Sequence, residues 1–428
     1  MSKFPIASIL SLSLVSITHA TVQQSICGHG IPKTPVDADA TVCIDSEISP
    51  PSSPSAWAPW THIPHCVEAE EEPWCVYTNA GFPRGHGISI ITTPDQASDA
   101  LNILTHAMDK PFFAPEKLYS TTPYEIREIP GKGKGVVATQ KIEKGRALLV
   151  DYATVLAAAE YPADVMHEEV RELMDAAVDR LGEPERVKTL SRLGRDSEEA
   201  SEVEDLLLTN SFVVGVGGKD YMGLFADVAR FNHDCKPNAF IHFSETTLAM
   251  TIWVARDIKA GEEITISYAA AGMVSKERQK TLEEVWGFKC QCTLCSAPKD
   301  VLEASDERRQ KIRKFQAKVP ELAQKGEFHS ALEAAEEMFE LIETEGLTEQ
   351  MGDMYEIPAR IYYHVGNLEK ALEYTLKVKH EINGYGFPGK YGEQKLKILD
   401  GVLKRIKSEL EKKKNLIFKD EEEKNKTG

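Results

Sequence analysis

Four cysteines constrain the fold of this chain most strongly, because three of them crowd into six residues. Cys290, Cys292 and Cys295 form a Cys-x-Cys-x-x-Cys motif. Thiols this close in sequence do not readily pair with one another as disulfides, but they can converge on one tetrahedral ion. A structural zinc site needs four ligands, and Cys235 is the one other cysteine in the last two thirds of the chain. We therefore expect a four-cysteine zinc site joining two distant segments; the alternative is four unrelated buried cysteines.

The segment that carries Cys235 is unusual in itself. Residues 229–239 read ARFNHDCKPNA, so an amide, an imidazole and a thiol follow closely at Asn232, His233 and Cys235. A lone Asn or His usually does no more than satisfy a buried hydrogen bond. A core strand rarely needs so many special side chains together. The composition suits a metal site, a ligand clamp or a nucleophile with its base.

Two further motifs flank this segment. GKGKG at 131–135 stands between two strand-like runs, where glycines let the backbone approach a ligand closely. It lacks the Gly-Lys-Ser/Thr ending of a phosphate-binding loop and no helix follows it, so a plain hairpin turn is the simplest alternative. GEEITISY at 261–268 predicts a turn and a strand that ends in Tyr268, ordinarily a half-buried strand aromatic.

The order of strand-like and helical patterns along the chain predicts an α+β fold. Strand-like runs begin at Tyr124, give way to amphipathic helical patterns over 162–209, and resume from Ala239. Residues 304–416 are helical throughout, and the pattern Gly-x-apolar-x-x-Ala-Leu-Glu occurs twice, from Gly326 and from Gly366. This spacing indicates either tetratricopeptide-like (TPR-like) hairpins or an ordinary helical bundle.

The N-terminal region predicts export. Lys3 precedes the apolar run 6–17, and Thr18-His19-Ala20 resembles a cleavage site, which is the layout of a secretory signal peptide; the alternative is a disordered or buried segment. No other segment could cross a membrane. Residues 21–120 predict a loop-rich leader with one short helix at 95–109. Its four cysteines suggest two disulfides with three possible connectivities; they are Cys27, Cys43, Cys66 and Cys75.

Composition narrows the choice of partners. The formal net charge of −17 argues against direct binding of nucleic acid, which needs a basic surface. It suits a Lys/Arg-rich partner, although most acidic proteins are merely soluble.

Taken together and in this order, the four motifs resemble the SET-domain family of protein lysine methyltransferases. TNSF at 209–212 and GLFADVARFNH at 223–233 are similar to the segments that follow the helical insert in the SMYD-type branch, which also carries a helical C-terminal extension. The resemblance covers 120–300 closely and 300–400 loosely. The chain departs from that branch because 152–222 contain no cysteine, and therefore no MYND zinc finger, and because of its N-terminal leader.

The resemblance implies a knot-like crossing of the NHDC segment with the strand that ends in Tyr268, forming an S-adenosylmethionine pocket. The expected cofactor contacts are Lys132, Gly133, Lys134, Asn210, Asn232, His233, Tyr268 and Phe288. Tyr268 would also be the catalytic residue, and structural Zn²⁺ would bind Cys235, Cys290, Cys292 and Cys295. The expected divisions are 1–20 signal peptide, 21–120 leader, 121–272 SET domain with its helical insert at 155–210, 273–300 post-SET zinc segment, and 301–428 TPR-like helices with a charged tail.

The implied function is methylation of lysine in a protein substrate, such as a basic histone tail. The alternative is a catalytically silent scaffold that acts through its C-terminal helices; methylation of another group is a third reading. The leader favours the secretory pathway, whereas the family resemblance favours the nucleus or cytoplasm.

Overall fold

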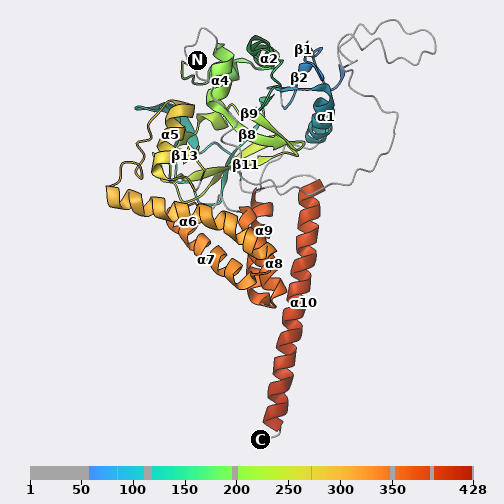
Figure 1. Ribbon diagram of the computed structural model, residues 1–428, viewed down its shortest axis with the longest axis vertical. Coiled ribbons are helices and arrows are strands. Elements are labelled where there is room, and N and C mark those ends of the chain that lie inside the picture. Colours follow the sequence, from blue (N-terminus) through green and yellow to red (C-terminus); the bar gives the residue numbers. More distant parts are fainter. Residues whose placement is uncertain are drawn as a thin grey trace, which may run out of the picture.

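The computed structural model describes residues 57–83, 85–109, 118–194, 201–270, 272–347, 352–385 and 390–426. Figure 1 shows a β-rich body with the C-terminal helices extending from one side of it. Three sheets make up the strands of the described part, in the orders β1-β2-β3-β7-β9-β8, β10-β13-β5-β4 and β11-β12-β6. The signal peptide predicted for 1–20 lies outside the described residues.

The first sheet overturns the expectation of a loop-rich leader. Its strands are β1 (His65–Val67), β2 (Trp74–Asn79), β3 (Ile88–Thr92), β7 (Val155–Ala158), β8 (Ser211–Val216) and β9 (Lys219–Leu224). Every residue of β2 and β3 is buried. Strands buried on both faces lack the polar alternation that marks a half-exposed strand, so WCVYTN and ISIIT do not stand out as strands in the sequence. Helix α1 (Pro94–Asp109) follows at the position predicted for the short helix.

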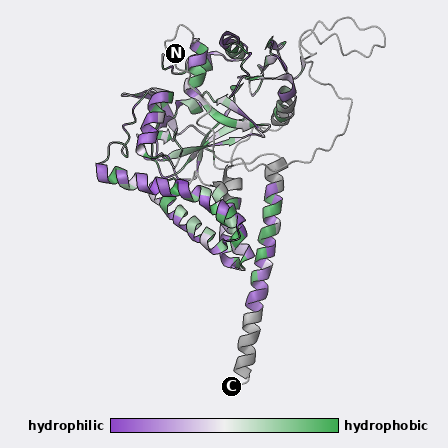
Figure 2. Cartoon of the chain, in the orientation of Figure 1, coloured by the Kyte–Doolittle hydropathy of each residue, from purple (hydrophilic) through white to green (hydrophobic). Residues whose placement is uncertain are grey.

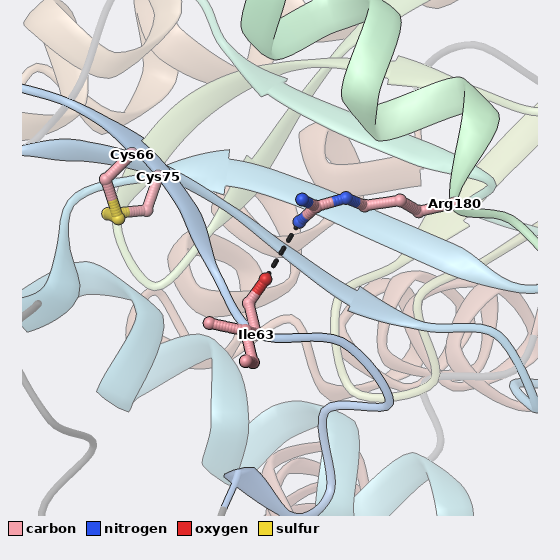
Figure 3. Close-up of a disulfide and its surroundings, with 4 residues drawn as sticks. All are labelled: Ile63, Cys66, Cys75 and Arg180. Atoms are coloured by element: carbon pink, nitrogen blue, oxygen red, sulfur yellow. Dashed lines mark hydrogen bonds between the residues drawn. A yellow bond between two sulfur atoms is a disulfide. The ribbon is translucent and has the colours of Figure 1, made fainter. Parts of the chain in front are cut away.

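A disulfide joins the first two strands of this sheet. Cys66 and Cys75 lie directly opposite each other in the antiparallel β1–β2 pair and are bonded (Figure 3). In the same view, Arg180 at the end of α2 donates from Nη1 to the carbonyl oxygen of Ile63, at 2.9 Å. The strand edge is therefore held to the helical insert as well as to its neighbour. Cys27 and Cys43 lie outside the described residues.

The helical insert is shorter than the predicted 155–210. Residues Val155–Ala158 form β7, which pairs parallel with β3 and antiparallel with β9 inside the first sheet. The helices that follow are α2 (His167–Asp179), α3 (Glu185–Lys188) and α4 (Glu202–Asn210). The face of α2 that packs on the sheet consists of Val170, Leu173, Met174, Ala177 and Val178, the 3.6-residue spacing of an amphipathic helix.

The other two sheets are built from the strand-like runs that the sequence predicts, apart from one two-residue strand. They contain β4 (Tyr124–Ile129), β5 (Gly133–Ala138), β6 (Ala147–Tyr152), β10 (Asn232–His233), β11 (Ala239–Ser244), β12 (Ala249–Val254) and β13 (Glu263–Ile266). A 3-10 helix, η4 (Val228–Arg230), leads into β10. The short strand β10 pairs parallel with β13, which places Asn232 opposite Thr265 and His233 opposite Ile266.

The C-terminal region consists of helices, as predicted. They are α5 (Ser275–Trp286), α6 (Lys299–Gln324), α7 (Phe328–Glu345), α8 (Glu356–His364), α9 (Leu368–Tyr385) and α10 (Lys390–Lys426), with the 3-10 helix η6 at Gly352–Tyr355. Apolar and polar bands alternate along α6 and α7 in Figure 2, as expected of helices buried on one face. None of the helices in the described part combines the length and apolarity of a membrane span.

The repeated pattern marks equivalent points of two helical hairpins, α6–α7 and α8–α9. Gly326 and Gly366 have φ of +76° and +77° and end the first helix of each hairpin. Glycine adopts this left-handed conformation without the steric penalty of a side chain. Ala331 and Ala371, five residues later, are fully buried in each second helix. The two copies are thus structural repeats of one hairpin.

Candidate functional site

The NHDC segment is held at its start by a buried carboxylate. Asp151 of β6 accepts the backbone N–H groups of Asp227, at 2.7 Å, and Val228, at 3.2 Å. Arg186 of α3 bonds the Asp227 carboxylate at 2.9 Å and lies 3.6 Å from that of Asp151. Burial, reinforced by Asp227, raises the pKa of Asp151 to about 7 although Arg186 opposes the shift. Contacts from β6 and from α3 therefore fix the residues that lead into β10.

The end of the segment is fixed by Asn238, which is buried. Its Nδ2 donates to the Glu263 carbonyl oxygen at 2.8 Å, and its Oδ1 accepts from the Thr265 backbone N–H at 2.8 Å. A side-chain amide used in this way replaces a pair of strand hydrogen bonds. The segment thus stays against β13 beyond the two residues of β10.

Asn232 and Lys132 share one carboxylate, that of Glu263. Lys132 Nζ lies 2.7 Å from Glu263 Oε2, and Asn232 Nδ2 donates to Oε1 at 2.9 Å and to the Lys134 carbonyl at 3.3 Å. A Cβ on Gly135 would come within 2.5 Å of Asn232 Nδ2. Only glycine permits this approach, so the GKGKG turn, β10 and β13 meet at one point.

His233 connects the predicted cofactor site to the predicted metal site. Its Nδ1 accepts the backbone N–H of Tyr268 at 2.9 Å, so the ring proton must lie on Nε2. Nε2 lies 3.3 Å from Cys235 Sγ and therefore donates toward it. Burial lowers the pKa of His233 to about 4, which keeps the ring neutral near pH 7.

Tyr268 stands in a group of aromatic rings. Its ring centroid lies 5.1 Å from that of Trp286, 5.4 Å from that of His233 and 6.5 Å from that of Phe288. Its hydroxyl donates to the Phe231 carbonyl oxygen at 2.8 Å. Burial, and next to it the charge of Glu263, raises the pKa of Tyr268, so the phenol remains protonated.

Asn210 is not joined to this group by any hydrogen bond among the described residues. Its amide donates to the carbonyl oxygens of Ser191, at 2.8 Å, and Leu206, at 2.7 Å. These bonds instead hold the C-terminal end of α4 together and join it to Ser191. Its role as a cofactor contact stays a prediction.

The four predicted metal ligands converge. The sulfur atoms of Cys235, Cys290, Cys292 and Cys295 all lie within 4.8 Å of one another. Cys235 Sγ is 3.9 Å from that of Cys290 and 3.6 Å from that of Cys295. Tetrahedral zinc with Zn–S bonds of about 2.3 Å requires sulfur atoms roughly 3.8 Å apart. The donor set therefore fits a structural zinc ion.

The main chain around the thiols is fixed by Gln279 of α5. Its Nε2 donates to the Cys290 carbonyl oxygen at 2.8 Å and its Oε1 accepts the Cys290 N–H at 2.9 Å. Hydrogen bonds from Cys235 and then from Cys290 and Cys295 lower the pKa of the Cys292 thiol. The thiolate form of Cys292 is thereby favoured.

Comparison with known protein families matches residues 133–269 to the SET domain. The chain therefore contains a SET domain. The match runs from β5 to just beyond β13, so the SET domain includes Asn232, His233, Cys235 and Tyr268. The motif of three cysteines and Phe288 follow it.

Relatives support the likeness to SMYD-type SET proteins. Histone-lysine N-methyltransferase set5 of Schizosaccharomyces pombe is 29% identical over 45% of this chain and 57% of its own length. Human histone-lysine N-methyltransferase SMYD3 is 33% identical over 24% of each chain. Histone-lysine N-methyltransferase ASHR1 of Arabidopsis thaliana is 41% identical over 20% of this chain and 18% of its own. The chain thus spans less than two thirds of the length of these relatives.

Several residues of the SET site were not foreseen from the sequence. Glu263, Gln279 and Trp286 each contact a predicted site residue. The signal was present for two of them, because Glu263 lies inside the quoted GEEITISY and Trp286 lies two residues before Phe288. For Gln279 the sequence offers no such signal, since it lies on a helix in which half of the residues are charged.

Proposed function

We propose that this SET protein transfers a methyl group from S-adenosylmethionine to a lysine side chain of a protein. The observation that carries the proposal is the parallel pairing of β10 with β13, which places Asn232, His233 and Tyr268 together. The three relatives described above are named histone-lysine N-methyltransferases, which supports the same reaction. No observation favours the silent-scaffold alternative over it.

The proposed cofactor contacts fit S-adenosylmethionine in chemical type. Lys132, Gly133 and Lys134 lie in the turn that Gly135 brings against Asn232, and Phe288 offers a flat apolar face suited to adenine. His233 and Tyr268 lie beside Phe288, and Asn210 is retained as a further predicted contact. When bound, S-adenosylmethionine supplies an electrophilic methyl group on its sulfonium. Zinc would remain structural, held by the four cysteines.

The protein's own contribution is alignment and exclusion of water. Because the Tyr268 hydroxyl proton is directed at the Phe231 carbonyl, its oxygen lone pairs are left to accept hydrogen bonds from the substrate amine. The rings of Trp286 and Phe288 exclude water, and desolvation lowers the pKa of an entering lysine. The neutral amine is the nucleophile that methyl transfer needs.

The proposed substrate is a lysine in a basic protein segment, such as a histone tail. The net charge of −17 attracts such a segment at low salt, and the relatives are named for histones. The same names favour the nucleus or cytoplasm over the predicted secretory route. Imaging of a C-terminal fluorescent fusion, together with sequencing of the mature N-terminus, distinguishes the two routes.

The direct test of cofactor binding is calorimetric titration of the zinc-loaded protein with S-adenosylmethionine. We expect saturable one-to-one binding that Asn232→Ala abolishes, because its amide bridges the GKGKG turn and Glu263. Asn367→Ala is the matched control, since Asn367 caps a helix of the C-terminal region through Lys370. Folded, zinc-loaded wild-type protein that binds no S-adenosylmethionine contradicts the proposal and favours the scaffold.

A further inference from the structure

Two buried guanidinium groups adjoin the cysteine cluster, and they come from different elements. Arg278 belongs to α5 and is 0% exposed, and Arg309 belongs to α6 and is 2% exposed. A buried cation is strongly unfavourable unless a counter-charge lies beside it. These two arginines therefore need negative charge nearby, and the cysteine cluster is the neighbouring group that could supply it.

Arg278 has too few partners for a buried guanidinium. Its Nη1 donates to the Met273 carbonyl oxygen at 2.7 Å and lies 3.7 Å from the carboxylate of Asp306. Its Nε and Nη2 atoms have no hydrogen-bond partner among the described residues. Cys235 and Cys295 lie close enough to Arg278 to act on its guanidinium electrostatically, as does Asp306. The missing counter-charge is thus on the side of the thiols.

Arg309 links a metal-ligand residue to the C-terminal helices. Its Nη2 donates to the Cys235 carbonyl oxygen at 2.8 Å, and its Nε bonds Glu345 of α7 at 2.9 Å. Glu345 is fully buried and also accepts from Ser305 Oγ at 2.7 Å and Arg308 Nε at 2.7 Å. One buried carboxylate therefore serves two guanidinium groups, and positive charge remains in excess next to the cluster.

A zinc ion bound by four thiolates carries a net charge of about −2, and N–H groups directed at the sulfur atoms stabilise it. We propose that Arg278 and Arg309 are the counter-charges of a zinc tetrathiolate, and that zinc binding in this way holds the α6–α7 hairpin against the SET domain. The inference rests on the zinc site and not on methyl transfer, so it holds or fails independently of the activity.

The consequence of zinc loss follows from the charges. Without the ion, the four thiols lose the bonds that hold them together, and the charge of the zinc tetrathiolate no longer faces the arginines. Arg278 is then a buried cation with a weak partner, and the Cys235 loop that accepts from Arg309 is released. Separation of α6 from α5 lets water reach both guanidinium groups. Zinc removal is therefore expected to loosen α6 and α7 before α9, which is remote from the cluster.

The first experiment measures hydrogen exchange of the wild-type full chain with zinc bound and after chelation. Both samples contain the same reducing agent, so that freed thiols do not form disulfides. We expect faster exchange in 232–238, α6 and α7 after chelation, and unchanged exchange in α9. Equal exchange of α6 and α7 in the two states overturns the coupling to the hairpin.

The second experiment measures zinc affinity by competition with a chromophoric chelator. Arg278→Met and Arg309→Met each keep an apolar side chain of similar length, and we expect affinity to fall about 10-fold or more, as for other residues that support metal ligands. Arg313→Gln is the matched control, because Arg313 joins the same helix to Glu277 and the Gly272 carbonyl without touching the cluster. Arg278→Lys and Arg309→Lys keep the charge, and we expect them to recover part of the zinc affinity. If a Met variant does not fold, the corresponding Lys variant is compared with the wild-type protein instead.

Wild-type zinc affinity in both Met variants, or equal affinity of the Met and Lys forms, overturns the counter-charge role. Loss of affinity in Arg313→Gln as large as in Arg278→Met also overturns it, because helix docking alone would then explain the effect. Wild-type protein that binds no zinc at all refutes the metal site itself. None of these outcomes depends on whether S-adenosylmethionine binds, so failure here is distinguishable from failure of the proposed function.

Discussion

At the scale of single residues, the proposed catalytic residue Tyr268 shows how the backbone can hold a side chain in place. Its hydroxyl proton is committed to the Phe231 carbonyl, and its backbone N–H is committed to His233. The residue is therefore fixed at both ends, and only its oxygen lone pairs are left for a substrate. Such fixed geometry is what lets one hydroxyl align an amine for attack.

Tyr268→Phe should therefore suppress methylation while the protein remains folded. We expect the rate to fall about 100-fold or more, as when one aligned polar group is removed from an active site. The measurement is transfer of labelled methyl groups to a panel of lysine-containing histone-tail peptides, with thermal unfolding as the check on folding. Tyr161→Phe is the control, because the Tyr161 hydroxyl is also buried, lies outside the site and has no hydrogen-bond partner among the described residues. An unchanged rate in Tyr268→Phe removes this hydroxyl from the mechanism.

Asp151 predicts a pH dependence of stability. A carboxyl whose pKa is raised to about 7 by burial favours the protonated form in the folded state. Its contribution to stability is complete below the unfolded pKa of about 4 and is lost as the pH rises through about 7. Between pH 5 and pH 8, we expect the free energy of unfolding of the wild-type protein to fall by on the order of 1–3 kcal/mol relative to that of Asp151→Asn. Urea unfolding at several pH values measures this, with the exposed Asp220→Asn as control; parallel profiles for all three proteins contradict it.

The sequence predicts the site residues that stand in motifs better than it predicts the residues that connect them. Asn232, His233, Tyr268 and the four cysteines stand in motifs, and the structure brings them together. Glu263 lies within a motif, but nothing in the sequence indicates its partners, and Arg309 has the appearance of an ordinary charged residue. Their roles arise from the β10–β13 register and from the docking of α6, which are non-local and cannot be read from spacing.

At the scale of elements, the same distinction separates the strands that could be predicted from those that could not. The run YEIREI alternates and forms the edge strand β4, mostly exposed. The buried strands β2 and β3 follow a Pro/Ser-rich segment and lack alternation, and β3 pairs with β7 more than 60 residues later. The Pro/Ser-rich composition of their surroundings concealed them. The two hairpins of the C-terminal region were predictable because a repeated glycine and alanine mark them.

The β1–β2 pair yields a prediction at this scale. The Cys66–Cys75 bond closes a short loop, with a sequence separation of 9, and holds an edge strand of the first sheet. Cys66→Ala combined with Cys75→Ala should cost about 2–3 kcal/mol of unfolding free energy, chiefly through the freedom gained by the unfolded chain. Urea unfolding with and without dithiothreitol measures it. Wild-type protein should respond to the reductant and the double variant should not; the same stability under all four conditions contradicts the prediction.

At the scale of the whole molecule, the net charge bears on how the proposed basic substrate would approach the protein. A net charge of −17 attracts a basic peptide over distances that salt screens. We expect KM for a histone-tail peptide to rise several-fold between about 50 mM and about 300 mM NaCl, with kcat little changed. A peptide with the same target lysine but glutamine at the other basic positions is the control, and its KM should vary little. A salt-independent KM for the basic peptide would place recognition in short-range contacts instead.

The helix α10 also has a consequence for how the molecule behaves in solution. Leu403 and Ile406 are buried, whereas residues 411–415 are exposed, and Figure 1 shows the helix continuing beyond the other C-terminal helices. Its 37 residues correspond to about 56 Å. A particle with such a projection has a larger frictional coefficient than a sphere of the same mass. It therefore elutes early from a gel-filtration column, and a single copy of the chain can be mistaken there for a dimer.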